Sequence, residues 1–126
     1  MLKNHLILEQ FMNEFLDAFG KKTAGLNFDQ KKKLCEAQKP AEIDPPIWKV
    51  LGAANILRNK IAHTLDQEQI QPKMDDLRAA YLGALTPTQV KEVEKLEDEQ
   101  IASGACEICG AYLAAATAAA KAPKKT

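Results

Sequence analysis

Apolar residues recur every three or four positions along most of this chain, and this spacing is typical of amphipathic helices. Val, Ile and Thr are few and never alternate with polar residues for long, so the strand signal is weak. The 126 residues contain no internal repeat and suffice for one domain with a substantial hydrophobic core. We therefore predict an all-α fold, a single small bundle of about five helices.

Five segments show helical periodicity, and a cap residue or a proline marks the start of four of them: Asn27, Asp44-Pro45, Pro72 and Thr86-Pro87. We expect helices over these residues: 2–19, 29–38, 46–64, 73–82 and from 87 to beyond 101. Three of the starts are well marked. Asn27 is a candidate N-cap, Asp44 precedes Pro45, and Thr86-Pro87-Thr88-Gln89 forms a capping box with proline at the first helical position.

The end of the chain differs in composition from the rest. Residues 114–122 are almost all alanine, which favours helix but supplies little packing. Residues 122–126 follow with a proline and two lysines. We therefore predict a helical domain over residues 1–110 and an Ala/Lys-rich C-terminal tail over residues 111–126, open to fraying.

Formal net charge is zero, but the charges are unevenly distributed. Residues 1–64 carry ten Lys/Arg and seven Asp/Glu, residues 65–110 carry four and ten, and residues 111–126 carry three Lys and no acid. A protein that binds nucleic acid regardless of sequence would have a more basic surface. Any anion-binding surface is therefore expected to be local.

The cysteine count and the apolar runs bear on location. Three cysteines without disulfide-scaffold spacing fit a reducing compartment. No apolar stretch looks long enough to span a bilayer, and the N-terminal segment lacks the apolar core of a signal peptide. We expect a cytoplasmic protein that does not contact a membrane.

The segment Leu57-Arg58-Asn59-Lys60-Ile61-Ala62-His63 is the most suggestive of chemistry. Arginine holds a phosphate with a rigid fork of donors, and histidine readily serves as a general base near neutral pH. On an ideal helix, however, Arg58 falls within the apolar stripe and His63 lies about 140° away. Either the helix unwinds near its end, or a site combines two chains, or these residues are structural.

The structural alternative is simple. Asn59 and His63 are four residues apart and can hydrogen-bond on a helix surface. An arginine in an apolar stripe needs a partner, which could be an acidic side chain or a phosphate. The candidate acidic partners are these: Glu14, Asp75 and Asp76.

Gly52 and Ile56 share a helix face with Asn59 and His63. A glycine at that position permits close approach by another helix, so we predict that Gly52 and Ile56 belong to a dimer interface. The first helix has an apolar face nearly half its circumference wide, which also favours contact with more than one neighbour, including a second subunit.

The arginine–histidine segment resembles the signature of the HEPN superfamily (higher eukaryotes and prokaryotes nucleotide-binding). In that pattern an arginine, usually followed by Asn, Asp or His, precedes a histidine by four to six intervening residues. Here Asn59 follows Arg58, and four residues separate Arg58 from His63. The motif covers about ten residues, and the helical layout of residues 1–85 is compatible with the family. The resemblance implies a HEPN-like bundle that dimerises and brings two motifs into one cleft.

Many members of the superfamily are metal-independent endoribonucleases, often toxins of toxin–antitoxin systems or antiphage effectors. By resemblance, His63 would be the base for the ribose 2′-hydroxyl, Arg58 would stabilise the scissile phosphate, and Asn59 would orient one of them or contact the phosphate. The products would carry a 2′,3′-cyclic phosphate and a 5′-hydroxyl. We expect no cofactor, a homodimer, an RNA substrate and an antitoxin or regulatory protein as partner.

Other residues near the motif are candidates for substrate binding. Lys49 and Lys60 are basic, and Trp48 is near enough in sequence to stack a base, although the core or an interface is its alternative place. Some superfamily members are inactive partners, nucleotide binders or regulators. A non-catalytic HEPN-like dimerisation or regulatory module therefore remains the alternative function, and a nucleotide-binding regulator is a third.

Two further sets of residues resemble parts of known sites. Cys106 and Cys109 have the spacing of half a zinc knuckle, but structural zinc needs four ligands and no second pair follows. We predict no metal site, and we interpret these residues as two reduced thiols with Cys109 partly buried. His5 lies at the edge of the first helix's apolar face and is expected to be a packed or surface histidine rather than a ligand.

Overall fold

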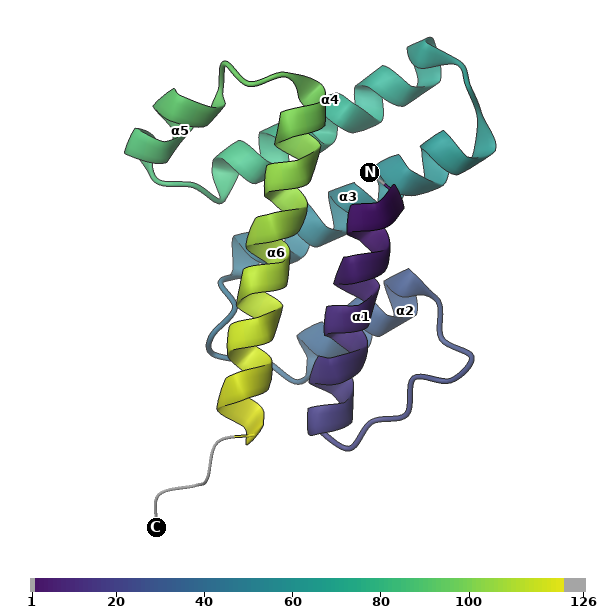
Figure 1. Ribbon diagram of the computed structural model, residues 1–126, viewed down its shortest axis with the longest axis vertical. Helices are drawn as coiled ribbons and strands as arrows, with labels where there is room; N and C mark the ends of the chain where they lie inside the picture. Colours follow the sequence, from purple (N-terminus) through teal and green to yellow (C-terminus); the bar gives the residue numbers. More distant parts are fainter. Residues whose placement is uncertain (1, 122–126) are drawn as a thin grey trace.

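The computed structural model describes residues 2–121, with side chains from residue 5 onward (Figure 1). Within that range it is all-helical, so the predicted fold class is confirmed. Its helices are these: α1 (Leu2–Ala18), α2 (Phe28–Ala37), α3 (Pro45–His63), α4 (Gln67–Gly83), α5 (Pro87–Val93) and α6 (Asp98–Lys121).

Two pairs of helices pack most extensively, α1 against α6 and α3 against α4. In Figure 1, α1 and α6 run side by side in the same direction, and the antiparallel pair α3 and α4 crosses behind them. The core lies where these pairs meet, because each helix turns its apolar stripe inward. Its fully buried side chains include these: Phe15, Leu51, Leu57, Leu77, Ile101 and Leu113.

Two of the three predicted caps, Asn27 and Thr86, form as local hydrogen bonds. The Asn27 side chain accepts from the Gln30 backbone at 2.8 Å while the Gln30 side chain accepts from the Asn27 backbone at 2.9 Å. Thr86 and Gln89 make the same reciprocal pair at the start of α5. Asp44 occupies the N-cap position of α3 without capping it, and its carboxylate instead accepts a hydrogen bond from Tyr112 Oη at 3.2 Å.

The fourth helix starts earlier than predicted. The sequence predicts a helix over residues 73–82 that opens after Pro72, whereas α4 begins at Gln67 and contains Pro72. The Asp66 side chain caps this earlier start by accepting from the Glu68 backbone N–H at 3.0 Å. Pro72 has no N–H to donate to the preceding turn, and the hydrogen bond from the Asp66 cap outweighs this loss within the first turns of the helix.

The predicted fifth helix is interrupted between α5 and α6. Arg78 on α4 stabilises the break, because its guanidinium donates to the Glu94 and Leu96 carbonyls at 3.4 and 3.0 Å. The same guanidinium bonds the Asp98 carboxylate at 2.7 Å, at the start of α6. Carbonyl groups that lose their helical partners at the break therefore find a cationic donor.

Helix α6 continues through residue 121, so the expectation of a tail from residue 111 is wrong for residues 111–121. Alanine supplies helix propensity, and the small side chains let α6 approach α1 closely. A Cβ at Gly110 would lie 3.0 Å from Phe11 Cε2, and Leu113 and Thr117 are buried. The predicted fraying of residues 122–126 lies outside the described residues.

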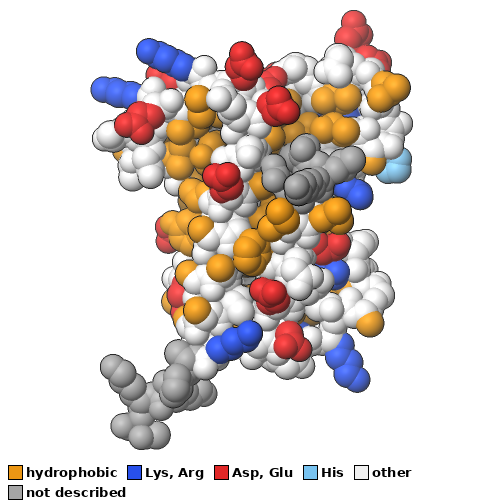
Figure 2. All heavy atoms as spheres, in the orientation of Figure 1, with side chains coloured by type: hydrophobic (Ala, Val, Ile, Leu, Met, Phe, Trp, Pro, Cys, Tyr) orange, Lys and Arg blue, Asp and Glu red, His pale blue; other side chains and the backbone are white. Residues whose placement is uncertain are grey.

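Helix α6 is also long and apolar enough to cross a membrane by length and composition alone, with a mean hydropathy of 1.3 over its best window. The expectation that no stretch reaches this limit is therefore wrong. Half of that window is buried inside the bundle, as in the core helix of a globular domain. On the face shown in Figure 2, hydrophobic side chains lie along α6 and beside α1, with acidic side chains among them.

Candidate functional site

Arg58, Asn59 and His63 line one pocket with a volume of about 650 Å³, within the range of small-molecule sites. The pocket lies where the second half of α3 faces α1 and the start of α2. The other described residues that line it come from all three helices and are these: His5, Leu6 and Glu9 of α1, Asn27 at the α2 cap, Phe28 and Asp29 of α2, and Asn55 of α3. The three residues of the predicted motif thus share one concave site.

Helix α3 stays helical through His63. Arg58 and His63 nevertheless reach the same pocket within one chain, so neither unwinding nor a second chain is needed to bring them together. Asn55, Asn59 and His63 follow each other at a spacing of four, which places them in one row along the helix. Arg58 joins this row through its side chain, because its Nη1 donates to Asn59 Oδ1 at 3.3 Å.

Arg58 is half-buried, and no carboxylate oxygen of the described residues lies within 4.0 Å of its guanidinium. The predicted ion pairs with Glu14, Asp75 or Asp76 are therefore wrong. Glu14 and Asp75 instead accept hydrogen bonds from glutamines on their own helices. Arg58 thus retains donors toward the pocket that suit a phosphate.

The two carboxylates of the pocket already have cationic partners. Glu9 pairs with the buried Lys31 at 3.2 Å, and Asp29 pairs with Lys33 one turn along α2 at 2.9 Å. These lysines offset the negative charge that would otherwise repel an anion. Within the part of the chain that the structure describes, the pocket therefore combines the guanidinium of Arg58, which has no carboxylate partner there, with acids that already pair with lysines.

His5 is the site residue that sequence reasoning missed. It is 4 % exposed, its Nε2 lies 3.2 Å from Asn55 Oδ1, and its ring stacks on Phe28 with centroids 4.0 Å apart. Burial lowers the pKa of His5 below its ordinary value; Arg58 lowers it further, while Asn55 and Glu9 oppose the shift. The prediction of a packed histidine is confirmed, but its partner is 50 positions away and no local pattern announces it.

The three residues predicted to bind substrate, Lys60, Lys49 and Trp48, lie at different distances from the motif. Lys60 lies with Ile56, Asn59, His63 and Lys73 around a second, shallower hollow of about 300 Å³, on the other side of the motif. Lys60 is therefore close enough to the motif to contact a bound strand.

Lys49 and Trp48 lie farther away. Lys49 is exposed but sits three turns before Lys60 on α3, about 16 Å along the axis, and does not line the pocket. Trp48 is only 8 % exposed and belongs to the core. The ring therefore cannot offer a face to a base, and its alternative placement in the core is confirmed.

The two predicted interface residues differ in their surroundings. A Cβ at Gly52 would lie 3.4 Å from Lys32 Cε, so the helix that approaches this glycine is α2 of the same chain. Ile56 is 52 % exposed and remains available to another molecule. The dimer contact stays a prediction, and its support within α3 now rests on Ile56.

The cysteines are buried thiols. Burial raises the pKa of Cys106 to about 11 and that of Cys35 to about 12, and it raises the pKa of Cys109 as well. Cys109 is fully buried rather than partly buried, and its Sγ lies 3.9 Å from the Ile47 carbonyl. Thiols held neutral in this way are poor nucleophiles.

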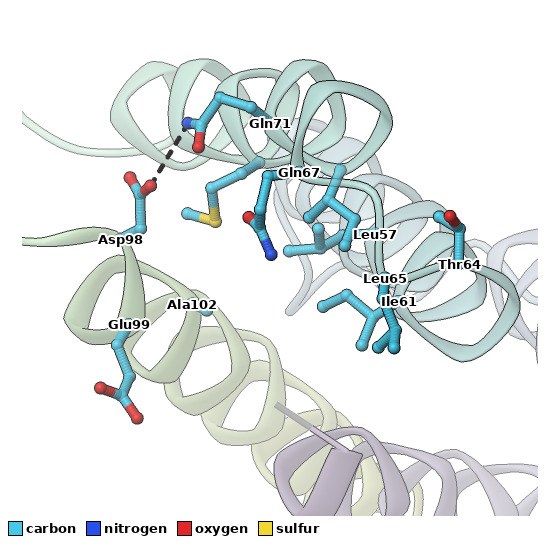
Figure 3. Close-up of a pocket in the computed structure, with 11 residues that line it drawn as sticks. Leu57, Ile61, Thr64, Leu65, Gln67, Gln71, Asp98, Glu99 and Ala102 are labelled. Carbon is cyan, nitrogen blue, oxygen red and sulfur yellow. Dashed lines mark hydrogen bonds between the residues drawn. The ribbon is translucent and has the colours of Figure 1, made fainter.

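A separate pocket of about 330 Å³ lies between α3, α4 and the start of α6 (Figure 3). Leu57, Ile61 and Met74 give it an apolar lining, and the Gln71 side chain donates to Asp98 at 3.3 Å at one end. Among the described residues that line it, the charged ones are acids, Asp98 and Glu99. This pocket therefore suits an apolar group and not a phosphate.

Comparison with protein-family models, curated proteins and solved structures found no match to this chain. Its function therefore has to be argued from the site itself.

Proposed function

We propose that the protein is a HEPN-type, metal-independent endoribonuclease of the toxin or antiphage-defence kind. One observation carries the proposal: a half-buried arginine, which has no carboxylate partner among the described residues, shares a pocket with a histidine at the spacing of the HEPN motif. A guanidinium and an imidazole are the two groups needed to cleave RNA through its own 2′-hydroxyl.

In the proposed reaction, an imidazole nitrogen of His63 takes the proton of a ribose 2′-hydroxyl. The 2′-oxygen bonds to the adjacent phosphorus, the bond from phosphorus to the 5′-oxygen breaks, and that oxygen leaves with a proton from the imidazolium or water. Arg58 offsets the negative charge that builds on the phosphate oxygens. Asn59 orients Arg58 through the 3.3 Å hydrogen bond.

We also propose that two copies associate through the α3 face that carries Ile56. That face adjoins the hollow shared by His63, Lys60 and Lys73, so a second copy would extend the basic surface beside each motif. An RNA strand is then the substrate, and an antitoxin or regulatory protein that covers the pocket would hold the activity in check.

The test is cleavage of a defined RNA by purified protein in EDTA. We expect products with 2′,3′-cyclic phosphate ends, and no cleavage at a mapped site whose ribose is replaced by 2′-deoxyribose. Arg58→Gln should slow cleavage about 100-fold or more, the scale for removing one donor to a developing oxyanion. Lys95→Gln, a matched loss of positive charge on an exposed residue, should cleave as the wild type does. Cleavage that persists unchanged in Arg58→Gln would refute the assignment.

A second function is favoured by the surface of α1 and α6, namely a non-catalytic HEPN-like dimerisation or regulatory module. Leu6 and Ile7 are 62 % and 47 % exposed. Ile7 and Phe11 of α1 line a shallow groove of about 350 Å³ together with Gly110 and its neighbours on α6. Exposed apolar side chains in one groove are typical of binding surfaces.

The two functions respond differently to substitution. For an interaction module, Ile7→Glu should abolish association measured by sedimentation, and His63→Ala should leave it unchanged. A wild-type protein that stays monomeric at micromolar concentration and captures no partner would contradict this alternative.

A further inference from the structure

The apolar pocket between α3, α4 and the start of α6 lies on a different face of α3 from the motif. Leu57 and Ile61 line it, whereas Asn59 and His63 line the motif pocket. Leu57 and Asn59 are about 200° apart around an ideal helix, so the two pockets use different sides of α3. The apolar pocket is therefore separate from the proposed site of cleavage.

This pocket has a buried apolar floor and an exposed apolar rim. Leu57, Met74 and Ala102 form the floor and are buried. Leu65, which follows the last residues of α3, stands at the rim and is 92 % exposed. The volume of about 330 Å³ admits a large apolar side chain. An apolar recess with an exposed apolar edge is typical of the places where a partner protein inserts an anchoring side chain.

The border of the pocket is acidic. Asp98 and Glu99 line it at the start of α6, and Asp75 of α4 accepts a hydrogen bond from the pocket residue Gln71 at 2.9 Å. Arg78 offsets the charge of Asp98 through an ion pair of 2.7 Å. Among the described residues, no Lys or Arg nitrogen lies within 4.0 Å of the carboxylates of Glu99 or Asp75. In Figure 3 the Glu99 carboxylate points away from the apolar lining, where a molecule lying across the pocket would meet it.

Charge is sorted between the two faces of the α3–α4 pair. Lys60 and Lys73 border the hollow beside His63, whereas acids border the apolar pocket. Residues 65–110, which supply most of the pocket, carry four Lys/Arg and ten Asp/Glu. Such a surface repels RNA phosphates and anionic lipid headgroups and attracts cationic groups. The complementary molecule is therefore basic and carries an apolar anchor.

The chain's own basic end lacks that anchor. Residues 121–126 carry three lysines, and their apolar residues are one alanine and one proline. Neither side chain fills a recess of leucine size or larger. The end of a second copy would therefore bring charge to the border and leave the pocket unfilled.

We propose that the apolar pocket and its acidic border form a docking surface for a basic amphipathic helix of a partner protein. A leucine or aromatic side chain of that helix enters the pocket against Met74 and Leu65, and Lys or Arg side chains about one turn away meet Glu99 and Asp75. The pocket residues of α4 form one stripe along which a helix can pack, and are these: Gln67, Ile70, Gln71 and Met74. The docking surface goes beyond the proposed function, because neither its face nor its partner takes part in RNA cleavage.

Methyl NMR of the full chain, labelled with ¹³C at the methionine methyl groups, tests the docking surface. Met74 lies in the pocket, and Met12 in the core of α1 is the internal control. The probe is a synthetic amphipathic helix of leucine and lysine, about 14 residues long, and its control has glutamate in place of lysine. We expect the lysine peptide to shift the Met74 signal and leave that of Met12 unchanged. The glutamate peptide should shift neither.

Two exposed residues separate the apolar and the charged contributions. Leu65→Ser and Glu99→Lys should each weaken binding of the lysine peptide about fivefold or more, measured by titration of the Met74 signal. Glu92→Lys, a matched charge reversal at an exposed position of α5, should change the affinity by less than about twofold. Because Leu65 and Glu99 are exposed, both variants should unfold at the temperature of the wild type.

Three results would overturn the docking surface directly: no Met74 shift with the lysine peptide at millimolar concentration, an equal response to the glutamate peptide, or an affinity unchanged in both variants. A Met74 signal that moves with protein concentration alone would assign the pocket to a second copy of this chain. A shift caused by an RNA oligonucleotide would assign it to nucleic acid. Either of these two outcomes would also overturn a basic partner helix as the occupant.

Discussion

The hydrogen bond between His5 and Asn55 should couple the stability of α1 to that of α3, and a double-mutant cycle measures this coupling. His5→Phe keeps a ring on Phe28 but leaves Asn55 Oδ1 without its 3.2 Å partner. An orphaned buried polar group costs about 1–3 kcal/mol, and water in the pocket keeps the value near the middle, about 2 kcal/mol. Asn55→Leu orphans the imidazole N–H and should cost a similar amount.

Independent losses would make the double variant about 4 kcal/mol less stable than the wild type. Because both single variants lose one and the same bond, we expect a double-variant loss of about 2 kcal/mol, a coupling of about 2 kcal/mol. Urea unfolding followed by circular dichroism supplies the four free energies of unfolding. His5→Phe combined with Gly83→Ala should be additive, since nothing lies within 4 Å of a Cβ at Gly83. A His5–Asn55 coupling below about 0.5 kcal/mol would refute the reasoning.

Three further predictions follow from buried groups. Because the pKa of His5 is lowered in the folded state, the unfolded chain binds this proton more readily than the folded chain does. The free energy of unfolding should therefore fall on acidification below about pH 6.5, by at most about 1.4 kcal/mol per pH unit for one proton. Urea titrations at pH 7 and 5 measure this fall, and His5→Phe should remove it. Gly104→Ala should destabilise the fold by about 1–2 kcal/mol, because a Cβ there would lie 2.7 Å from Tyr81 Oη and this overpacking outweighs the gain in helix propensity. Gly83→Ala, where a Cβ meets nothing within 4 Å, should instead stabilise the fold by about 0.5–1 kcal/mol. Thermal unfolding of the two variants checks the sign of each change. The three buried cysteines should react with a thiol reagent only slowly until urea is added, and fast labelling of the folded protein would contradict their burial.

Features set by a few neighbouring residues were predictable from the sequence. The N-cap at Asn27 and the capping box at Thr86 form as expected, because a cap depends on four consecutive residues. The interruption between α5 and α6 was not predictable, since Arg78 of α4 binds the freed carbonyl groups from 16 and 18 positions away. The alanine-rich end was underestimated because its packing depends on α1, at the opposite end of the sequence.

The candidate site also contains features that the sequence could predict and features that depend on distant contacts. Arg58, Asn59 and His63 could be named from their spacing along one helix, and Lys60 from its place beside them. Their convergence could not be deduced from a helical wheel, which places Cβ directions and ignores the reach of an arginine side chain. The role of His5 could not be read either, because its two contacts, with Phe28 and Asn55, join three separate helices.

The most direct measurement of the central claim is the cleavage rate of one RNA, in EDTA, by the wild type and by His63→Ala. His63 is exposed at the end of α3, so its removal should leave thermal unfolding unchanged. If its imidazole takes the 2′-hydroxyl proton, the rate should fall about 100-fold or more. Equal rates for the two proteins, or no cleavage by the wild type, would contradict a ribonuclease site built on Arg58 and His63.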